Sequence, residues 1–308
     1  MSIKELWVEK YRPNTVDGYV FRDEQQRKQI DTWIKDKSIP HLLLSGSAGI
    51  GKTTLAKILI HELGIEDYDV LEINASRTNS VDDVRDKITN FVSMIPFGPF
   101  KVVLLDEADY LSPNAQAALR GVMEEYSNTA RFILTCNYPN RIIPALHSRC
   151  QGFHVERTDL TEFTARVATI LVTEGTDFDL ETLDLYVKVA YPDLRKCINL
   201  VQQNVHDNKL AQPNTSDSGE AEWKFEMVAL FTEGKIKEAR KLLCGKVRAE
   251  EMEEIYRWLY DNIAIFGSEQ SQDQAVLVIK QGLVDHTLVA DAEINLAAVL
   301  VKLARLFD

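Results

Sequence analysis

Nine residues near the start of the chain have the types and spacing that hold a polyphosphate. The glycines allow successive backbone N–H groups to turn inward around phosphate oxygens, and the lysine adds a positive charge. In this pattern Lys52 is expected to contact the β- and γ-phosphates of ATP, and Thr53 to ligate Mg²⁺. The predicted nucleotide loop consists of Gly46, Ser47, Ala48, Gly49, Ile50, Gly51, Lys52, Thr53 and Thr54.

Two adjacent carboxylates, Asp106 and Glu107, end an apolar run that starts at residue 101. Such a run is typical of a buried strand in a parallel sheet, and ligands bind these sheets at the carboxyl ends of the strands. Asp106 is expected to hold Mg²⁺, directly or through water, and Glu107 to polarise the attacking water. The alternative is that both carboxylates merely end a strand in solvent, and the phosphate loop argues against it.

The elements that must position these groups alternate along the first half of the chain. Continuous apolar runs predict strands at 41–45, 70–74, 101–106, 131–136 and, more weakly, 153–156. Helical patterns lie between them, one beginning at Ser80 and another at Ser112, which precedes a proline. This alternation predicts a P-loop α/β domain over residues 1–156, with a five-stranded parallel sheet.

The second half of the chain predicts helices only, because the strand patterns stop near residue 156. We expect a small helical domain at 157–206 and a second helical domain at 221–308. The segment 207–220, rich in Asn, Ser, Thr and Asp, is predicted to be a linker. The last helix carries more apolar residues than one surface helix needs, so it forms either a subunit interface or a helix buried within its domain.

The amino-acid composition limits the classes of protein to which this chain can belong. The 308 residues are 45% apolar and 27% charged, which is ordinary for a soluble globular protein, and no apolar run is long enough to span a membrane. The absence of a secretion signal and the wide spacing of the four cysteines predict an intracellular protein with reduced thiols. The net charge of −12 argues against a nucleic-acid coat protein and leaves room for a local DNA-binding patch.

Several further segments resemble, in order and spacing, the ATPase subunits of AAA+ sliding-clamp loaders. The resemblance covers the whole chain, and its most specific element is the triplet around Arg149. The chain is similar to the small subunits of replication factor C and to the ATPase subunit of tailed-phage clamp loaders. We expect the chain to be closer to the phage type. The segments are Trp7–Pro13, Met123–Tyr126, Phe132–Asn137, Ser148–Cys150 and Tyr191–Lys196.

This resemblance implies a helical lid, a helical collar that oligomerises, and specific roles for residues around the nucleotide. Asn137 matches sensor 1, close to the γ-phosphate and the water, and Arg195 matches sensor 2, which reaches the phosphates from the lid. Arg149 matches the arginine finger, which enters the site of the neighbouring subunit. The residues implied to wall the adenine pocket are Val8, Glu9, Lys10, Tyr11, Arg12 and Val20.

The same resemblance implies partners: other clamp-loader subunits in a ring or spiral, the sliding clamp, and primer–template DNA. Binding of ATP would open the clamp, and DNA would trigger hydrolysis and clamp release during replication. Such a protein would work in the cytoplasm of a prokaryotic host if phage-encoded, or in the nucleus if eukaryotic. The implied DNA contacts are Arg77, Ser80 and Arg85, and the implied clamp contacts are Met94, Ile95, Pro96, Phe97 and Phe100.

Each partner contact has an alternative. The two arginines could be an exposed basic pair on a solvated helix, and the apolar residues after position 93 could belong to the core. Two positions also depart from the family pattern. Arg77 stands where an aspartate is usual, and Gly121 stands where a second arginine often follows Arg120.

Three other functions compete with this interpretation. A branch-migration or origin-binding ATPase would end in a basic winged helix, whereas residues 219–308 hold 16 acidic and 11 basic residues. A structural subunit without turnover would not need Lys52, Glu107 and Asn137 together with Arg195. A helicase, suggested by the Asp-Glu-Ala-Asp run at 106–109, would need a second α/β motor domain.

Overall fold

The computed structural model describes residues 5–21, 23–77, 81–212, 222–247 and 251–306. Contacts divide the chain into two compact units, Met1–Phe163 with Pro192–Lys196, and Thr164–Tyr191 with Cys197–Asp308. The first unit carries the large sheet, and the second is built mainly from helices. The finer division of the helical half into residues 157–206 and 221–308 stays a prediction.

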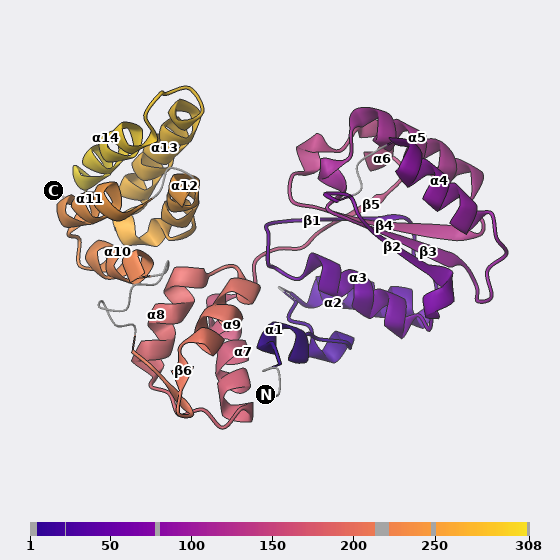
Figure 1. Ribbon diagram of the computed structural model, residues 1–308, viewed down its shortest axis with the longest axis horizontal. Coiled ribbons are helices and arrows are strands. Elements are labelled where there is room, and N and C mark those ends of the chain that lie inside the picture. Colours follow the sequence, from indigo (N-terminus) through magenta and orange to yellow (C-terminus); the bar gives the residue numbers. More distant parts are fainter. Residues whose placement is uncertain (1–4, 22, 78–80, 213–221, 248–250, 307–308) are drawn as a thin grey trace. The chain divides into compact units, whose positions relative to one another are not determined.

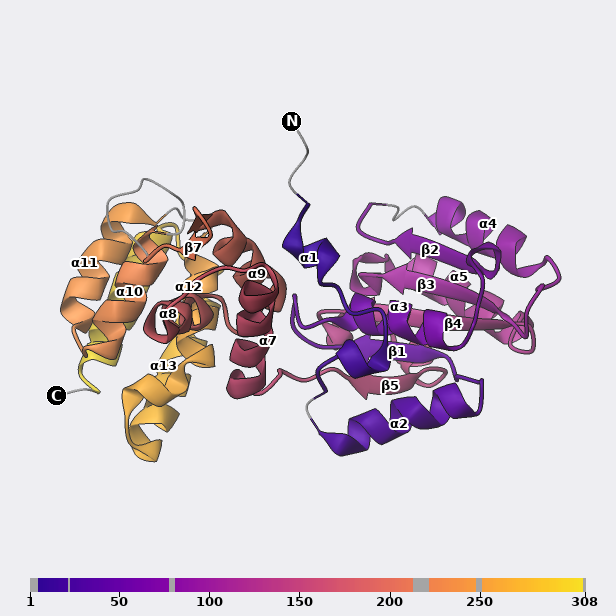
Figure 2. The same cartoon turned by 90° about the horizontal axis from the view of Figure 1, so that it is seen from below.

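The first unit is an α/β domain around a five-stranded parallel sheet, as the alternating pattern predicts. The strands lie in the order β2-β3-β4-β1-β5, which Figure 2 shows, and every neighbouring pair is parallel. The bounds are β1 Leu42–Ser45, β2 Val70–Asn74, β3 Lys101–Asp106, β4 Ala130–Cys136 and β5 Gln151–His154. The last strand begins two residues before the predicted position, because pairing with β1, and not apolar content, sets its limits.

Helices cover both faces of this sheet, with α2 and α3 on one face and α4 and α5 on the other (Figure 1). The central strands β3, β4 and β1 are therefore buried on both sides, and β1 shows why they appear as continuous apolar runs. Leu42 and Leu44 pack into one core and Leu43 into the other. The helices of this unit are α1 Trp7–Lys10, α2 Glu24–Lys35, α3 Lys52–Glu62, α4 Val81–Val92, α5 Pro113–Glu125 and α6 Pro144–His147.

Helix α5 begins as its sequence predicts. The hydroxyl of Ser112 accepts a hydrogen bond from the backbone N–H of Ala115 at 3.2 Å, and Pro113 fills the first helical position. Ser80, the predicted cap of α4, lies outside the described residues.

Within the second unit, the helices after residue 221 pack around one apolar core. The buried face of α14 contributes Leu296, Leu300 and Leu303 to this core, so the buried-helix alternative accounts for most of the apolar excess in that helix. None of the described helices has both the length and the apolarity needed to cross a membrane. The helices are α7 Leu160–Thr173, α8 Leu180–Ala190, α9 Leu194–Gln203, α10 Glu222–Thr232, α11 Ile236–Lys246, α12 Met252–Asp261, α13 Glu269–His286 and α14 Ala292–Ala304, and the first residues of α7 and α9 belong to the first unit.

A short antiparallel hairpin corrects the expectation that strands stop after residue 156. It pairs β6 Val205–His206 with β7 Lys209–Leu210, so the first part of the predicted linker is turn and strand. Asp207 and Asn208 form the turn with φ of 49° and 58°. Two-residue hairpin turns need such positive φ values, which Asp and Asn tolerate. The hairpin was not predicted because strands of two residues are too short to show an alternating pattern in the sequence.

Candidate active site

The nucleotide loop joins the carboxyl end of β1 to the first turn of α3, and its glycines lie where side chains do not fit. A Cβ atom on Gly46 would come within 2.3 Å of the backbone oxygen of Val155. A Cβ atom on Gly49, whose φ is 74°, would lie 2.0 Å from the carboxylate of Asp193. Helix α3 begins directly after the loop, so its free N–H groups and its dipole favour an anion there.

Lys52 is buried at the first position of α3 and is held in place on three sides. Its Nζ donates to the carbonyl oxygens of Gly46 at 3.0 Å and Ser47 at 2.6 Å, and to Oδ1 of Asn137 at 2.8 Å. Burial lowers the pKa of Lys52, since a buried ammonium loses hydration, while nearby carboxylates oppose this shift. A bound polyphosphate would supply the negative charge that favours the protonated form.

Thr53 and Asp106 come together as the predicted metal-binding pair. The Thr53 hydroxyl donates to Oδ1 of Asp106 at 2.7 Å, so two oxygen ligands lie side by side at the edge of the loop. Mg²⁺ binds proteins through one or two such oxygens and completes its shell with water and phosphate. The pair therefore fits a magnesium ion bound together with a nucleotide.

Glu107 lies next to this pair with an unusual backbone. Its φ of 58° and ψ of 43° are in the left-handed region, which costs a residue of this type about 1–3 kcal/mol. The backbone N–H of Glu107 donates to the hydroxyl of Thr135 at 3.0 Å, and that hydroxyl donates to Asp106 at 2.6 Å. Thr135 on β4 thus holds both Asp106, the last residue of β3, and Glu107, which follows it.

Three residues around the loop were not among the predicted site residues. Thr135 interrupts the apolar run Phe132–Leu134 near the end of β4, and this polar residue is a signal that the sequence offers. Asp109 belongs to the Asp-Glu-Ala-Asp run, which was considered only for a helicase. Tyr19 packs its ring against Gly51, and burial raises the pKa of its phenol. Nothing in its sequence context distinguishes it from the predicted neighbour Val20.

The remaining predicted nucleotide residues belong to the first unit. Arg195 is exposed in the first turn of α9, and its positive charge lowers the pKa of Lys52. Arg12 forms an ion pair with Glu9 at 2.5 Å at the end of α1. Among the predicted adenine residues, the half-buried ones are Val8, Tyr11, Arg12 and Val20, and the exposed ones are Glu9 and Lys10.

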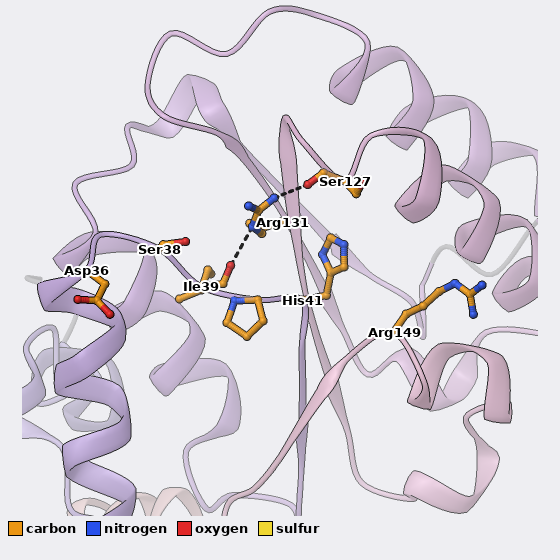
Figure 3. A pocket seen from close by; sticks show the side chains of 8 residues that line it. Asp36, Ser38, Ile39, His41, Ser127, Arg131 and Arg149 are labelled. Carbon is orange, nitrogen blue, oxygen red and sulfur yellow. Dashed lines mark hydrogen bonds between the residues drawn. The ribbon is translucent and has the colours of Figure 1, made fainter.

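Arg149 lies near the amino-terminal ends of the strands, whereas the nucleotide loop lies at their carboxyl ends. It precedes β5, at the level where the N–H of Gln151 donates to the carbonyl of His41 before β1 begins. Its guanidinium pairs with Glu124 of α5, to which Arg120 also pairs at 3.5 Å. Arg149 borders an open hollow, where it extends away from Arg131 (Figure 3). The hollow is lined by Asp36, Ser38, Ile39, Pro40, His41, Ser127, Arg131 and Arg149.

Of the predicted DNA and clamp residues, Arg77 lies in the turn after β2, Arg85 on α4, and the clamp residues on the segment between α4 and β3. Arg77 and Arg85 are exposed, and so are Met94, Ile95 and Phe97, by 61%, 88% and 81%. Pro96 is half-buried. The inclusion of Phe100 was wrong, because its side chain is only 5% exposed and packs in the core with the helices α2 and α3.

A buried carboxylate holds the exposed loop in shape. Oδ2 of Asp69 accepts hydrogen bonds from the backbone N–H groups of Phe97 at 2.9 Å and Gly98 at 2.7 Å. Its Oδ1 pairs with the equally buried Lys101 at 3.0 Å. Tyr68, which is also exposed, contacts the ring of Phe97 edge-on with centroids 4.9 Å apart. The loop therefore presents large apolar side chains to solvent on a fixed backbone.

Comparisons with known proteins agree with this geometry. Residues 42–157 match the ATPase family associated with various cellular activities (AAA). The chain is 36% identical to the replication factor C small subunit of Sulfurisphaera tokodaii, over 99% of this chain and 97% of that protein. The corresponding subunit of Archaeoglobus fulgidus is 36% identical, over 98% of both chains.

Among solved structures, the fold is similar to that of the Thermotoga maritima RuvB Holliday junction branch migration motor. The TM-score is 0.55 and the identity 17%, over 80% of each chain. A point mutant of RuvB from the same organism has a TM-score of 0.56 and 16% identity, over 80% of this chain and 81% of that one. At such identities the likeness concerns the fold alone.

Proposed function

We propose that this chain, which belongs to the replication factor C small-subunit family of AAA ATPases, is an ATP-hydrolysing subunit of a sliding-clamp loader. The observation that carries the proposal is the joined site in which Lys52 contacts Asn137 and Thr135 links Asp106 to Glu107. A branch-migration motor is not favoured, because the likeness to RuvB concerns the fold only, whereas the replication factor C subunits match along nearly the whole chain. The closer resemblance to phage loaders stays a prediction.

In this proposal the residues around the loop bind the triphosphate and prepare a water for attack. Lys52 contacts the β- and γ-phosphates, and the backbone N–H groups of residues 46–53 surround their oxygens. Thr53 and Asp106 hold Mg²⁺, which neutralises phosphate charge when bound. Glu107 polarises the water that attacks the γ-phosphate, and Asn137 orients it.

Two arginines complete the site from outside the loop. Arg195 supplies a positive charge from the start of α9, close enough to influence Lys52. Arg149 serves the site of an adjacent subunit, where a planar guanidinium neutralises charge on the transferring phosphoryl group. We propose that the chain acts inside the cell in an oligomer with other loader subunits, a sliding clamp and primer–template DNA.

Clamp binding tests this proposal through the exposed loop. Replacing Ile95 and Phe97 together with serine should raise the Kd for a candidate sliding clamp at least about tenfold, because each buried apolar anchor contributes about 1.5–3 kcal/mol. The measurement is co-purification with the clamp, followed by titration, in the presence of a non-hydrolysable ATP analogue. The matched control changes two exposed apolar residues elsewhere, Val172 and Leu180, to serine. Equal losses in both variants would contradict the docking role of the loop.

DNA binding is tested through the exposed arginines of the α4 region. Arg77→Ala with Arg85→Ala should weaken the stimulation of ATP hydrolysis by primer–template DNA, for any DNA sequence, and leave DNA-independent hydrolysis nearly intact. Since each phosphate contact releases counterions, the slope of log affinity against log salt should become shallower by about 2. The readouts are ATPase stimulation and DNA affinity across a salt series.

The control for this variant is Lys28→Ala with Lys35→Ala, which removes the same charge from α2. Both lysines are exposed, and α2 lies on the face of the sheet opposite α4. This control should keep normal stimulation. If the arginine variant is stimulated as strongly as wild type, Arg77 and Arg85 are an ordinary solvated pair.

A further inference from the structure

The catalytic ends of β3 and β4 lie beyond the backbone pairing that holds these two strands together. The β3–β4 register ends at the pair Leu105 and Leu134. Glu107 and Asn137 come after this point, each on a separate connection. Side chains that bridge the two strand ends therefore help to fix their mutual position.

Asp109 forms one of these bridges. It lies in the single helical turn Ala108–Tyr110, two residues after Glu107, and its side chain is buried with the residue only 5% exposed. Its Oδ2 accepts hydrogen bonds from the backbone N–H groups of Asn137 at 3.3 Å and Tyr138 at 3.1 Å. The left-handed backbone of Glu107 lets the chain reverse directly after β3, so that Asp109 faces the end of β4.

The second carboxylate oxygen of Asp109 has a different environment. Oδ1 is buried and has no hydrogen-bond partner among the described residues. A buried carboxylate needs polar partners, and the two backbone N–H groups at the end of β4 supply them for Oδ2. Asp109 also lies close enough to Lys52 for its charge to oppose the lowering of the lysine pKa.

We propose that Asp109 is a positioning residue that holds the backbone of Asn137 at a fixed place relative to Glu107. The inference rests on the proposed role of Asn137 in orienting the attacking water. In this role Asp109 acts on turnover through Asn137, whose backbone N–H it binds. Because a displacement of about 1 Å in such a group can cost about 10²-fold in rate, a residue that only holds a backbone can have a large kinetic effect.

The test is a double-mutant cycle between Asp109 and Asn137 in the full-length protein. Asp109→Ala should lower kcat for ATP hydrolysis by about 10²-fold, while the affinity for a fluorescent ATP analogue changes far less. In the Asn137→Ala background the same change should lower kcat by less than about twofold, because the group it positions is already missing. Asp109→Asn keeps an oxygen that accepts both N–H groups and should retain most of kcat.

A control at another buried carboxylate separates positioning from general damage to the fold. Asp69 also accepts two backbone N–H groups, but near Phe97 and far along the chain from Asn137. Asp69→Asn should lower the melting temperature, since it removes the partner of Lys101, and its effect on kcat should be the same with and without Asn137→Ala.

Three outcomes would overturn the inference. One is a kcat loss for Asp109→Ala that is equally large in both backgrounds. Another is a loss for Asp109→Asn that matches the loss for Asp109→Ala. A third is a wild-type rate for Asn137→Ala, which would contradict the proposed role of Asn137 itself and remove the ground of the inference.

Discussion

Replacing Arg149 with alanine is expected to lower ATP turnover by about 10³-fold or more while leaving ATP affinity nearly unchanged. This is the scale of loss when an arginine finger is removed, because charge on the transferring phosphoryl group is no longer neutralised. The measurement is steady-state ATP hydrolysis in the presence of clamp and DNA, together with equilibrium binding of a fluorescent ATP analogue.

The position of Arg149 supports the prediction that it serves the site of a neighbouring subunit. Val155 follows β5 and lies against the nucleotide loop at Gly46, and the four extended residues of β5, Gln151–His154, separate it from the turn that carries Arg149. At about 3.3 Å per residue this strand alone spans roughly 13 Å, which is beyond the reach of one side chain. In the single chain the guanidinium pairs with Glu124, so it must leave that partner to act.

Mixing experiments show whether Arg149 acts in trans. A Lys52→Ala subunit has a defective site and an intact finger, and an Arg149→Ala subunit has the reverse. Mixtures should regain activity wherever the site of an Arg149→Ala subunit receives the finger of a Lys52→Ala neighbour. Background hydrolysis at every mixing ratio, with mixed assembly verified separately, would contradict the trans role. Arg149→Lys should recover only part of the rate, because an ammonium cannot make the bidentate contact.

Replacing Glu107 with glutamine is expected to keep ATP binding and to lower turnover by about 10²–10⁴-fold. The amide has the size and shape of the carboxylate but cannot polarise the water. The glutamine variant should therefore hold clamp and DNA in the ATP-bound state. Rapid-quench hydrolysis and retention of clamp on primed DNA measure the two effects.

The control for this variant is Glu72→Gln, on β2 of the same sheet. Glu72 is exposed and forms a surface ion pair with Lys57 at 2.9 Å, so its loss should change stability and turnover little. Near-normal turnover by Glu107→Gln would remove the Glu107 carboxylate from the reaction.

The sequence by itself determined the features that contiguous residues create. The glycines and lysine of the nucleotide loop, the two carboxylates after an apolar run and the Ser112–Pro113 helix start all follow from neighbours in the chain. The central strands of the large sheet were also predictable, because a strand buried on both faces needs an uninterrupted apolar run. The α/β class and the five-stranded sheet were confirmed for this reason.

Only the tertiary structure decided which distant residues meet. Lys52 and Asn137 are 85 residues apart and Arg149 and Glu124 are 25 apart, and both contacts depend on the strand order and on the helices packed against it. Phe100 resembles its exposed neighbour Phe97 in type, but the backbone turns it into the core. Local patterns determine the backbone conformation of a segment and the face of the helix or strand on which each residue lies. Burial and side-chain contacts depend instead on the pairing of distant segments, which no short window of sequence contains.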